Sequence, residues 1–563
     1  MRFWIAAALF ILSVIFMLVG LGQRTIWAPP PSTSASIKVD ASAPYTVIPN
    51  SVISLNPGNP IIRVSGAKNA FVSSGRESDV MAWVGSSKYQ NLEIAEGTLT
   101  FVEHPGDSVF AVPAGSDLWR EESASIEKAQ LRVKSSDEVA VLVASNGKLA
   151  APGNIEIIWP IYHDLTWSNI FLISGAAFLF AALLFNWLTY RSIRRKSGPK
   201  RKTPKAPKPP QYRARKRASL APVRGRRSSR RAFVAIPASL VVLGLLSGCS
   251  TPTGEPTPSA SAEQIEVPPA VVTAKQLERI LGSVSNAASL ADEALDKKLL
   301  TSRFAGPALS LRAVNYYLRT KSSSVAATPA VVGEPITFSL PAASSTWPRT
   351  VMAVTDERGD AALPQMLILQ QRSPRENYRV WFNVRLMPGA KIPEVPAADA
   401  GAIPVDPASV FLKIAPQSIP AAYGDVINRG ASSLSAGLFD TSKDEFYKQV
   451  SESQKSQVAT LTTAKITFTH ALGDKNVQSL ATSAGGALVA VYMTDTYTIK
   501  PIRRISAVAV TGQEKILLGA DGSTTGVKSV YGDMLLFYVP ALSDEQGIRL
   551  LGVTQGLLSV RSL

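Results

Sequence analysis

The sequence predicts a membrane protein with two transmembrane helices, an extracytoplasmic all-β sandwich-like domain, a third hydrophobic segment with a lipobox, and a C-terminal α+β region. Three observations support this fold class. Three apolar runs are long enough to enter a bilayer, and a dense basic segment lies between the second and the third. The remaining stretches have the periodicities of strands and amphipathic helices.

The first apolar run, FWIAAALFILSVIFMLVGLG, covers residues 3–22 and contains no charged residue. A helix of this length crosses about 30 Å of hydrocarbon. Gln23 and Arg24 follow the run, so a small-residue cleavage site is missing. We therefore expect residues 1–22 to be a transmembrane helix or signal anchor, with a cleaved signal peptide as the alternative.

Residues 23–166 have the pattern of an extracytoplasmic β-rich domain. Short runs rich in valine and isoleucine are separated by Gly, Pro, Asn and Ser, namely IIRVSG, DVMAWVG, GTLTFVEH, SVFAVPAG, AQLRVKS, EVAVLVASNG and IEIIWP. This spacing predicts a small sandwich or barrel. Within it, Arg76, Glu77, Asp79 and Trp83 have two interpretations, a recognition patch or plain surface charge beside a core tryptophan.

The second apolar run, NIFLISGAAFLFAALLFNWLTY, predicts a transmembrane helix within residues 167–190. Trp159, Tyr162 and Trp167 precede it, and Trp187 and Tyr190 lie at its end. Aromatic side chains of this kind are typical of the two membrane interfaces.

Residues 191–231 form a proline-rich loop of low complexity with 18 basic residues and no acidic residue, so this loop accounts for the formal net charge of +17. Such a segment cannot bury a core, and its positive charge predicts a disordered cytoplasmic loop attracted to anionic lipids. Nucleic acid is disfavoured as a partner because Tyr212 is the one aromatic residue of the loop. The residues assigned to topology and anionic-lipid contact are Arg191, Arg194, Arg195, Lys196, Lys200, Arg201, Lys202, Arg230 and Arg231.

The third hydrophobic segment, residues 232–249, has the order of a lipoprotein signal peptide. Arginines precede an apolar run, Leu246, Ser247, Gly248 and Cys249 follow it, and a Ser/Thr/Pro-rich tether covers 250–272. These four residues resemble the bacterial lipobox, which implies acylation of Cys249 and cleavage before it. The alternative is a transmembrane helix that ends in a cysteine.

This arrangement predicts a multi-pass protein of the plasma membrane with both folded regions extracytoplasmic and a lipid anchor at Cys249. Cys249 is the single cysteine of the chain, so no internal disulfide can form. Cleavage would yield a two-span protein and a separate lipoprotein, which a fusion of two reading frames would also explain.

The C-terminal region repeats one order of elements twice, over residues 273–395 and 408–563. In each half, helical periodicity is followed by several long strand patterns, as in KQLERILGSVSNAASLADEAL and later YRVWFNVRL. This order predicts two α+β units. It is similar to tandem NTF2-like or cystatin-like domains.

Parts of the sequence also resemble known bacterial groups. GRESDVMAWVG, SDLWREE and VLVASNGKLAAPGNIEIIWP, within about the first 190 residues, resemble uncharacterised actinobacterial membrane proteins, and the C-terminal region resembles actinobacterial lipoproteins of unknown function. The resemblance implies an envelope location and no known activity.

Catalytic patterns are sparse. His104, His163 and His470 lie in separate contexts and are expected to be structural, and we expect no metal and no cofactor. The predicted function is non-enzymatic ligand binding or scaffolding at the outer face of the membrane, with cell-wall or envelope proteins as partners. The alternative is an envelope hydrolase or transferase that uses carboxylates in the C-terminal domains.

Overall fold

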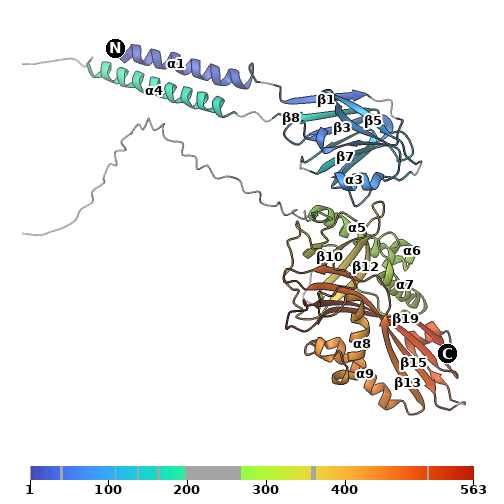
Figure 1. Cartoon of the computed structure of the whole chain (residues 1–563). Helices are drawn as coiled ribbons and strands as arrows, with labels where there is room; N and C mark the ends of the chain where they lie inside the picture. The colour runs from blue at the N-terminus through green and yellow to red at the C-terminus, as the bar shows by residue number, and fades with distance from the viewer. Residues whose placement is uncertain are drawn as a thin grey trace, which may run out of the picture. The chain divides into compact units, whose positions relative to one another are not determined.

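The computed structural model describes residues 2–28, 30–38, 42–107, 110–135, 138–161, 165–196, 268–356, 363–503 and 506–563. The chain forms two compact units (Figure 1). One unit holds the two long apolar helices. The other combines residues 29–163, which lie between these helices in the sequence, with residues 266–563.

Helices α1 (Arg2–Arg24) and α4 (Thr166–Lys196) form an antiparallel hairpin. The end of α1 meets the start of α4, where the Ser168 hydroxyl donates to the Gly20 carbonyl at 2.8 Å. A Cβ atom added to Gly20 would lie 2.8 Å from Cγ of Leu172. The absence of a side chain at Gly20 therefore lets the two backbones approach closely, as small residues do between membrane helices.

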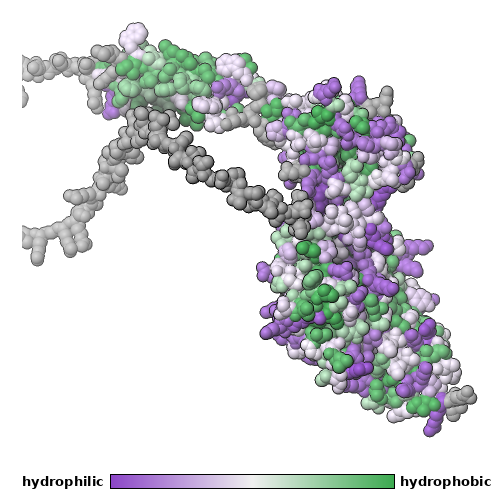
Figure 2. Space-filling model, viewed as in Figure 1, coloured by the Kyte–Doolittle hydropathy of each residue, from purple (hydrophilic) through white to green (hydrophobic). Residues whose placement is uncertain are grey.

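The hairpin exposes a largely apolar surface. The helical segments Phe3–Arg24 and Thr166–Arg194 are long and apolar enough to cross a membrane, and 22% and 17% of their most apolar windows are buried. Figure 2 shows apolar side chains over most of the visible face of the hairpin. The two apolar helices predicted from the sequence are thus confirmed, while their orientation in a membrane stays a prediction.

Residues 30–161 form the β-domain, whose eight strands belong to one branched sheet in the order β1-β8-β3-β7-β2-β4-β5, with β6 paired to β3. The elements are β1 (Ser32–Lys38), β2 (Tyr45–Ile48), α2 (Asn50–Ile53), β3 (Ile61–Arg76), α3 (Glu77–Val84), β4 (Tyr89–Ala95), β5 (Thr98–His104), β6 (Glu121–Arg132), β7 (Val139–Ala144) and β8 (Asn154–Pro160). Strand β3 pairs first with β8 and then with β7. Buried apolar side chains gather in two clusters. The predicted β-rich character is confirmed, although a sandwich would have two separate sheets.

One predicted strand is a helix. The run DVMAWVG has the residues of a strand, but most of it lies in α3. Val80, Trp83 and Val84 have the spacing of one helical face and are buried in the β-domain core. Burial of this face therefore outweighs the strand propensity of valine and tryptophan.

The C-terminal region has the α+β composition predicted from the sequence. Its helices are α5 (Ala274–Ala294), α6 (Lys297–Leu300), α7 (Gly306–Lys321), α8 (Ile419–Arg429), α9 (Glu445–Thr460) and α10 (Gly512–Leu518), with short 3-10 turns at Pro416–Ser418, Gly430–Ser432 and Ala436–Leu438. Its strands are β9 (Ile336–Pro341), β10 (Arg349–Thr355), β11 (Gln365–Gln371), β12 (Arg379–Leu386), β13 (Ala464–Leu472), β14 (Gln478–Ala481), β15 (Ala487–Pro501), β16 (Val508–Ala509), β17 (Gly522–Ser523), β18 (Val527–Val539) and β19 (Arg549–Ser562).

Both halves of this region share one sheet, in the order β13-β15-β18-β19-β12-β11-β10-β9, with β14 paired to β15. The halves join where β12 pairs with β19, through Arg385 with Val553 and Leu386 with Gly552. Helices α5 and α7 pack on one apolar cluster, and α8 and α9 pack on a second (Figure 1). The likeness of each half to an NTF2-like unit stays a prediction.

Candidate functional site

The β-domain and the C-terminal region meet at an interface that contains helix α3. Nη2 of Arg349, at the start of β10, donates to Oδ1 of Asp79 at 2.6 Å, and Nε of Arg76 donates to Oδ2 of Asp79 at 3.3 Å. The side chains of Arg349 and Asp79 are 0% and 4% exposed. The Arg349 guanidinium also lies 3.8 Å from the centre of the Trp347 ring. This cation–π contact is favourable for a cation that has lost its hydrating water. This ion pair is therefore almost fully desolvated.

Asp117 is a second buried carboxylate at the interface. Its Oδ2 accepts from Nη1 of Arg303 at 2.6 Å and from the backbone N–H of Tyr378 at 2.8 Å. Its own backbone N–H donates to Oδ1 of Asn377 at 3.0 Å. Hydrogen bonds to an ionised group are stronger than neutral ones, so Asp117 is an anchor and not a solvated surface charge.

Arg375 reaches across the interface to the end of α3. Its Nε donates to the carbonyl of Trp83 and its Nη2 to the carbonyl of Val84, both at 2.8 Å. The last carbonyls of a helix lack intrahelical partners and carry the negative end of the helix dipole. A cation from the C-terminal region therefore caps a helix of the β-domain.

Helix α5 supplies further polar contacts. Nε2 of Gln276 donates to the Asp117 carbonyl at 3.2 Å, and Nη2 of Arg279 donates to the Trp119 carbonyl at 2.6 Å. Gln276 also forms a capping box with Thr273 at the start of α5. Gln276, in the first turn of α5, therefore both caps this helix and binds the β-domain.

The C-terminal side of this interface belongs to a recognised sequence family. Residues 268–562 match the family model described as Domain of unknown function (DUF8094). The chain belongs to the DUF8094 family. No curated protein and no solved structure matches the chain. The DUF8094 domain, residues 268–562, thus supplies the arginines that bind the β-domain.

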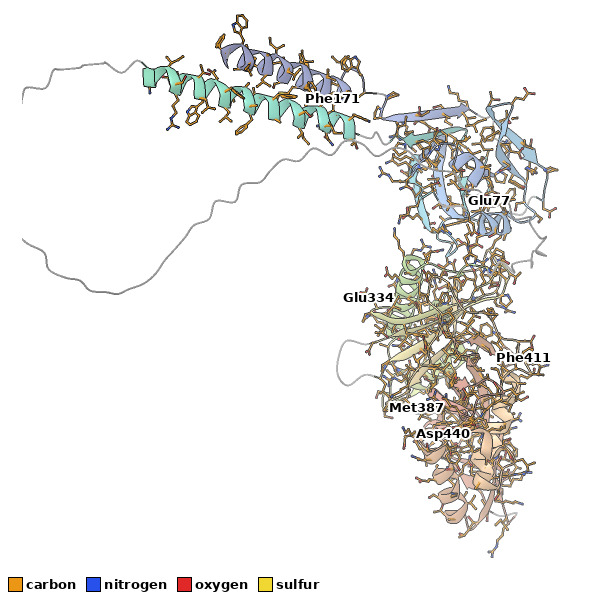
Figure 3. The ribbon with its side chains drawn as sticks, turned by 60° about the vertical axis from the view of Figure 1, so that its left-hand side comes forward. Glu77, Phe171, Glu334, Met387, Phe411 and Asp440 are labelled. Atoms are coloured by element: carbon orange, nitrogen blue, oxygen red, sulfur yellow. The ribbon has the colours of Figure 1, made fainter. Side chains whose placement is uncertain are left out.

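The interface also decides between the two interpretations of the group Arg76, Glu77, Asp79 and Trp83. Arg76 and Asp79 are buried, and Arg76 additionally donates to the carbonyls of Pro269 and Ala270 at 3.3 and 3.1 Å. Figure 3 labels Glu77, the first residue of α3, and Figure 1 shows α3 at the end of the β-domain that faces α5. Arg76 and Asp79 therefore belong to a recognition surface for the DUF8094 domain of the same chain. Glu77 instead accepts from the backbone N–H of Asn50, and Trp83 is a core tryptophan of the β-domain.

A second feature, the acid–base cluster, lies within the DUF8094 domain and consists of His470, Asp495 and Asp533. His470 of β13 lies opposite Asp495 of β15, and Asp533 of β18 is two residues from Tyr531, which also lies opposite Asp495. Nδ1 of His470 hydrogen-bonds Oδ1 of Asp495. All three side chains are buried. The sheet register therefore places one imidazole and two carboxyl groups together without contact with water.

The two carboxyl groups differ in their electrostatic surroundings. Burial, followed by the charge of Asp495, raises the pKa of Asp533 well above the ordinary carboxyl value. Neither carboxyl oxygen of Asp533 has a hydrogen-bond partner, so burial favours the neutral acid there. Oδ1 of Asp495 instead pairs with Nδ1 of His470.

The predicted lipidation site falls outside the described residues. Cys249 and the lipobox residues Leu246, Ser247 and Gly248 all lie there. The same holds for Lys200, Arg201, Lys202, Arg230 and Arg231. Their assigned roles remain predictions.

The described basic residues of the loop lie at the end of α4. Arg191 and Arg194 are exposed, and their guanidinium groups lie 5.2 and 5.1 Å from the ring centres of Trp187 and Tyr190. The helical backbone continues through Arg195 to Lys196. Each of these arginines thus lies beside an aromatic ring at the end of α4, a composition typical of a membrane interface.

The histidines have different surroundings. His104 stacks on Tyr89 with 4.5 Å between ring centres, His163 lies outside the described residues, and His470 belongs to the acid–base cluster. Within the described ranges, no group of three or more His, Cys, Asp or Glu side chains is placed to hold a metal ion.

Sequence reasoning missed the acid–base cluster, although a signal was present. Asp495 alternates with the same residues of β15 as Val491 and Met493 do, and so lies on their face of the strand. Asp533 likewise lies on the same face of β18 as Leu535. Alternate residues of a strand share one face, so these carboxyl groups occupy core positions. An acidic residue on the buried face of an apolar strand is almost always paired with another group.

Proposed function

We propose that this DUF8094 protein is a non-enzymatic membrane protein of the cell envelope that acts as an assembly platform. Helices α1 and α4 cross the plasma membrane, and the β-domain lies at the outer face and holds the DUF8094 domain. The buried pair of Asp79 and Arg349 carries this proposal. Two side chains can form such a pair only when their domains are in the same aqueous compartment.

The docking constrains the path of the chain. If α4 leads from the β-domain to the opposite face of the membrane, the chain must cross back between residues 196 and 268 to reach the DUF8094 domain. Residues 232–246 are the one long apolar run in this stretch of sequence. Fifteen residues are short for a stable span but suit the core of a signal peptide. The interface thus supports a third crossing that ends at Cys249.

Charge supports the direction of these crossings. The basic residues 191–231 follow α4, and an excess of Lys and Arg is retained on the cytoplasmic side. The loop is then available to anionic headgroups, at about 1 kcal/mol for each basic residue near the surface. The docked β-domain and DUF8094 domain face outward, where cell-wall or envelope proteins are the available partners.

The alternative, an envelope hydrolase or transferase that uses carboxylates, has less support. Asp495 and Asp533 do lie side by side, as a carboxylate mechanism requires. Both side chains are 0% exposed, however, so a substrate could not reach either without opening the domain. The buried pair is better suited to a structural or electrostatic role than to direct attack on a substrate.

Thiol labelling tests the compartment of each domain. We expect Leu434→Cys in the DUF8094 domain and Leu149→Cys in the β-domain to react with a membrane-impermeant maleimide in intact cells, because these positions are 99% and 57% exposed. Ser197→Cys in the basic loop should react only after permeabilisation. The wild-type chain, with Cys249 as its single cysteine, gives the background. Labelling of Leu434→Cys only in permeabilised cells would reject the proposal.

Metabolic labelling with a palmitate analogue tests the lipid anchor. The wild-type chain should incorporate the label and Cys249→Ala should not, because the thiol is the acceptor. Cleavage before Cys249 should also produce two fragments in the wild type and one full-length chain in the variant. A full-length, unlabelled wild-type protein would remove the lipoprotein part of the proposal and leave the docking part intact.

A further inference from the structure

A groove of about 320 Å³ lies between α8, α9 and β13 of the DUF8094 domain. Part of its lining is apolar, including Ile427, Val458 and Phe468. Its polar lining includes Asn428, Gln454 and Lys455, and none of the described residues that line it is acidic. The groove therefore places a cation and two amides beside apolar surface.

The acid–base cluster lies directly behind this polar lining. Nε2 of His470 is 3.2 Å from Oδ1 of Asn428 and 3.4 Å from Nε2 of Gln454. The ring is fixed in place from α8, because a Cβ atom added to Gly424 would lie 2.2 Å from Cβ of His470. His470 therefore supports the two amides of the groove lining from behind.

Oδ1 of Asn428 is the amide atom that lies near Nε2 of His470. The NH₂ group of Asn428 is therefore left for the groove, whose lining also includes Lys455.

We propose that this groove binds an anionic amphiphile, with a carboxylate or phosphate head held by Asn428 and Lys455 and an aliphatic part against Val458 and Phe468. The charge of the lining is complementary to an anion, and its apolar part is complementary to a short alkyl chain. This role goes beyond the assembly role and does not depend on it.

Calorimetry on the full chain in lipid nanodiscs tests the proposal, with empty nanodiscs as the blank. Octanoate and octyl phosphate should each bind with one site per chain. Asn428→Asp, which replaces the amide N–H groups by a charged oxygen, and Lys455→Gln should each weaken binding about tenfold or more. Lys465→Gln removes an exposed lysine of β13 outside the groove and should change affinity by less than about twofold.

The outcomes separate the alternatives. Binding of octanoate alone assigns a carboxylate head, binding of octyl phosphate alone assigns a phosphate head, and both support the site. The proposal is overturned if neither anion binds, if octyltrimethylammonium binds as well as octanoate, or if inorganic phosphate binds as well as octyl phosphate. It is also overturned if Lys455→Gln, an exposed substitution that leaves the fold intact, has the affinity of the wild type.

Discussion

Asp79→Ala should lower the free energy of unfolding of the docked β-domain and DUF8094 domain by about 3–5 kcal/mol, because it leaves Arg349 buried without its carboxylate. Arg349 has no exposed side-chain surface, so water cannot replace the lost partner. Arg76 loses the same carboxylate and keeps only its contacts to backbone carbonyls. The loss should appear in denaturant unfolding of the purified full-length chain, prepared with Cys249→Ala so that it stays uncleaved.

A surface pair in the same interface provides the matched control. Lys275 and Glu121 are 2.9 Å apart, but their side chains are 77% and 37% exposed. Lys275→Ala should therefore cost less than about 1 kcal/mol. If Asp79→Ala is no more destabilising than Lys275→Ala, the buried pair is not the anchor of the interface.

The same substitution should separate the two domains. With cleavage before Cys249 blocked by Cys249→Ala, a protease site inserted in the tether, residues 250–265, allows the chain to be cut after it has folded. The fragments that keep Asp79 should remain together on a column, and the fragments of Asp79→Ala should separate. Asp79→Leu combined with Arg349→Met replaces the ion pair by apolar groups and should restore much of the lost stability.

Asp533→Asn should change how stability depends on pH. Because burial and Asp495 raise the folded-state pKa of Asp533, its contribution to stability is fully present below its unfolded value of 3.8 and is lost as pH rises through the folded value. Each pH unit in that window removes about 1.4 kcal/mol. Asparagine remains neutral, so the variant should gain stability relative to the wild type as pH rises.

Denaturant unfolding of both proteins over a series of pH values measures this difference. Asp521→Asn is the control, because Asp521 is 85% exposed and its removal should shift the curve without changing its slope. Parallel curves for the wild type and Asp533→Asn would show that Asp533 is ionised in the folded domain, contrary to the proposed cluster.

Local patterns of the sequence predicted most regular elements. The helical spacing of Leu277, Ile280, Leu281 and Val284 corresponds to α5, and the alternation of YRVWFNVRL corresponds to β12. Helix α3 was predicted as a strand because eight residues rich in Val and Trp carry too little periodicity to separate the two structures. Its conformation depends on the core it packs against.

The candidate sites were less accessible from sequence. Arg76, Asp79 and Trp83 were recognised as a possible patch, but their partners Arg349 and Arg375 lie about 270–290 residues away and carry no motif. His470, Asp495 and Asp533 come from three strands, and only their register brings them together. Pairing between distant segments cannot be derived from the periodicity of each segment alone.

The sequence by itself determined the apolar helices, the basic segment after the second of them, and the succession of a β-rich and an α+β region. These features depend on composition and short-range periodicity, which each segment carries within itself. The tertiary structure decided that the two folded regions bury arginine–aspartate pairs against each other and that an imidazole shares the core with two carboxyl groups. Such contacts depend on which distant side chains are desolvated together, and that is fixed only when the whole chain has packed.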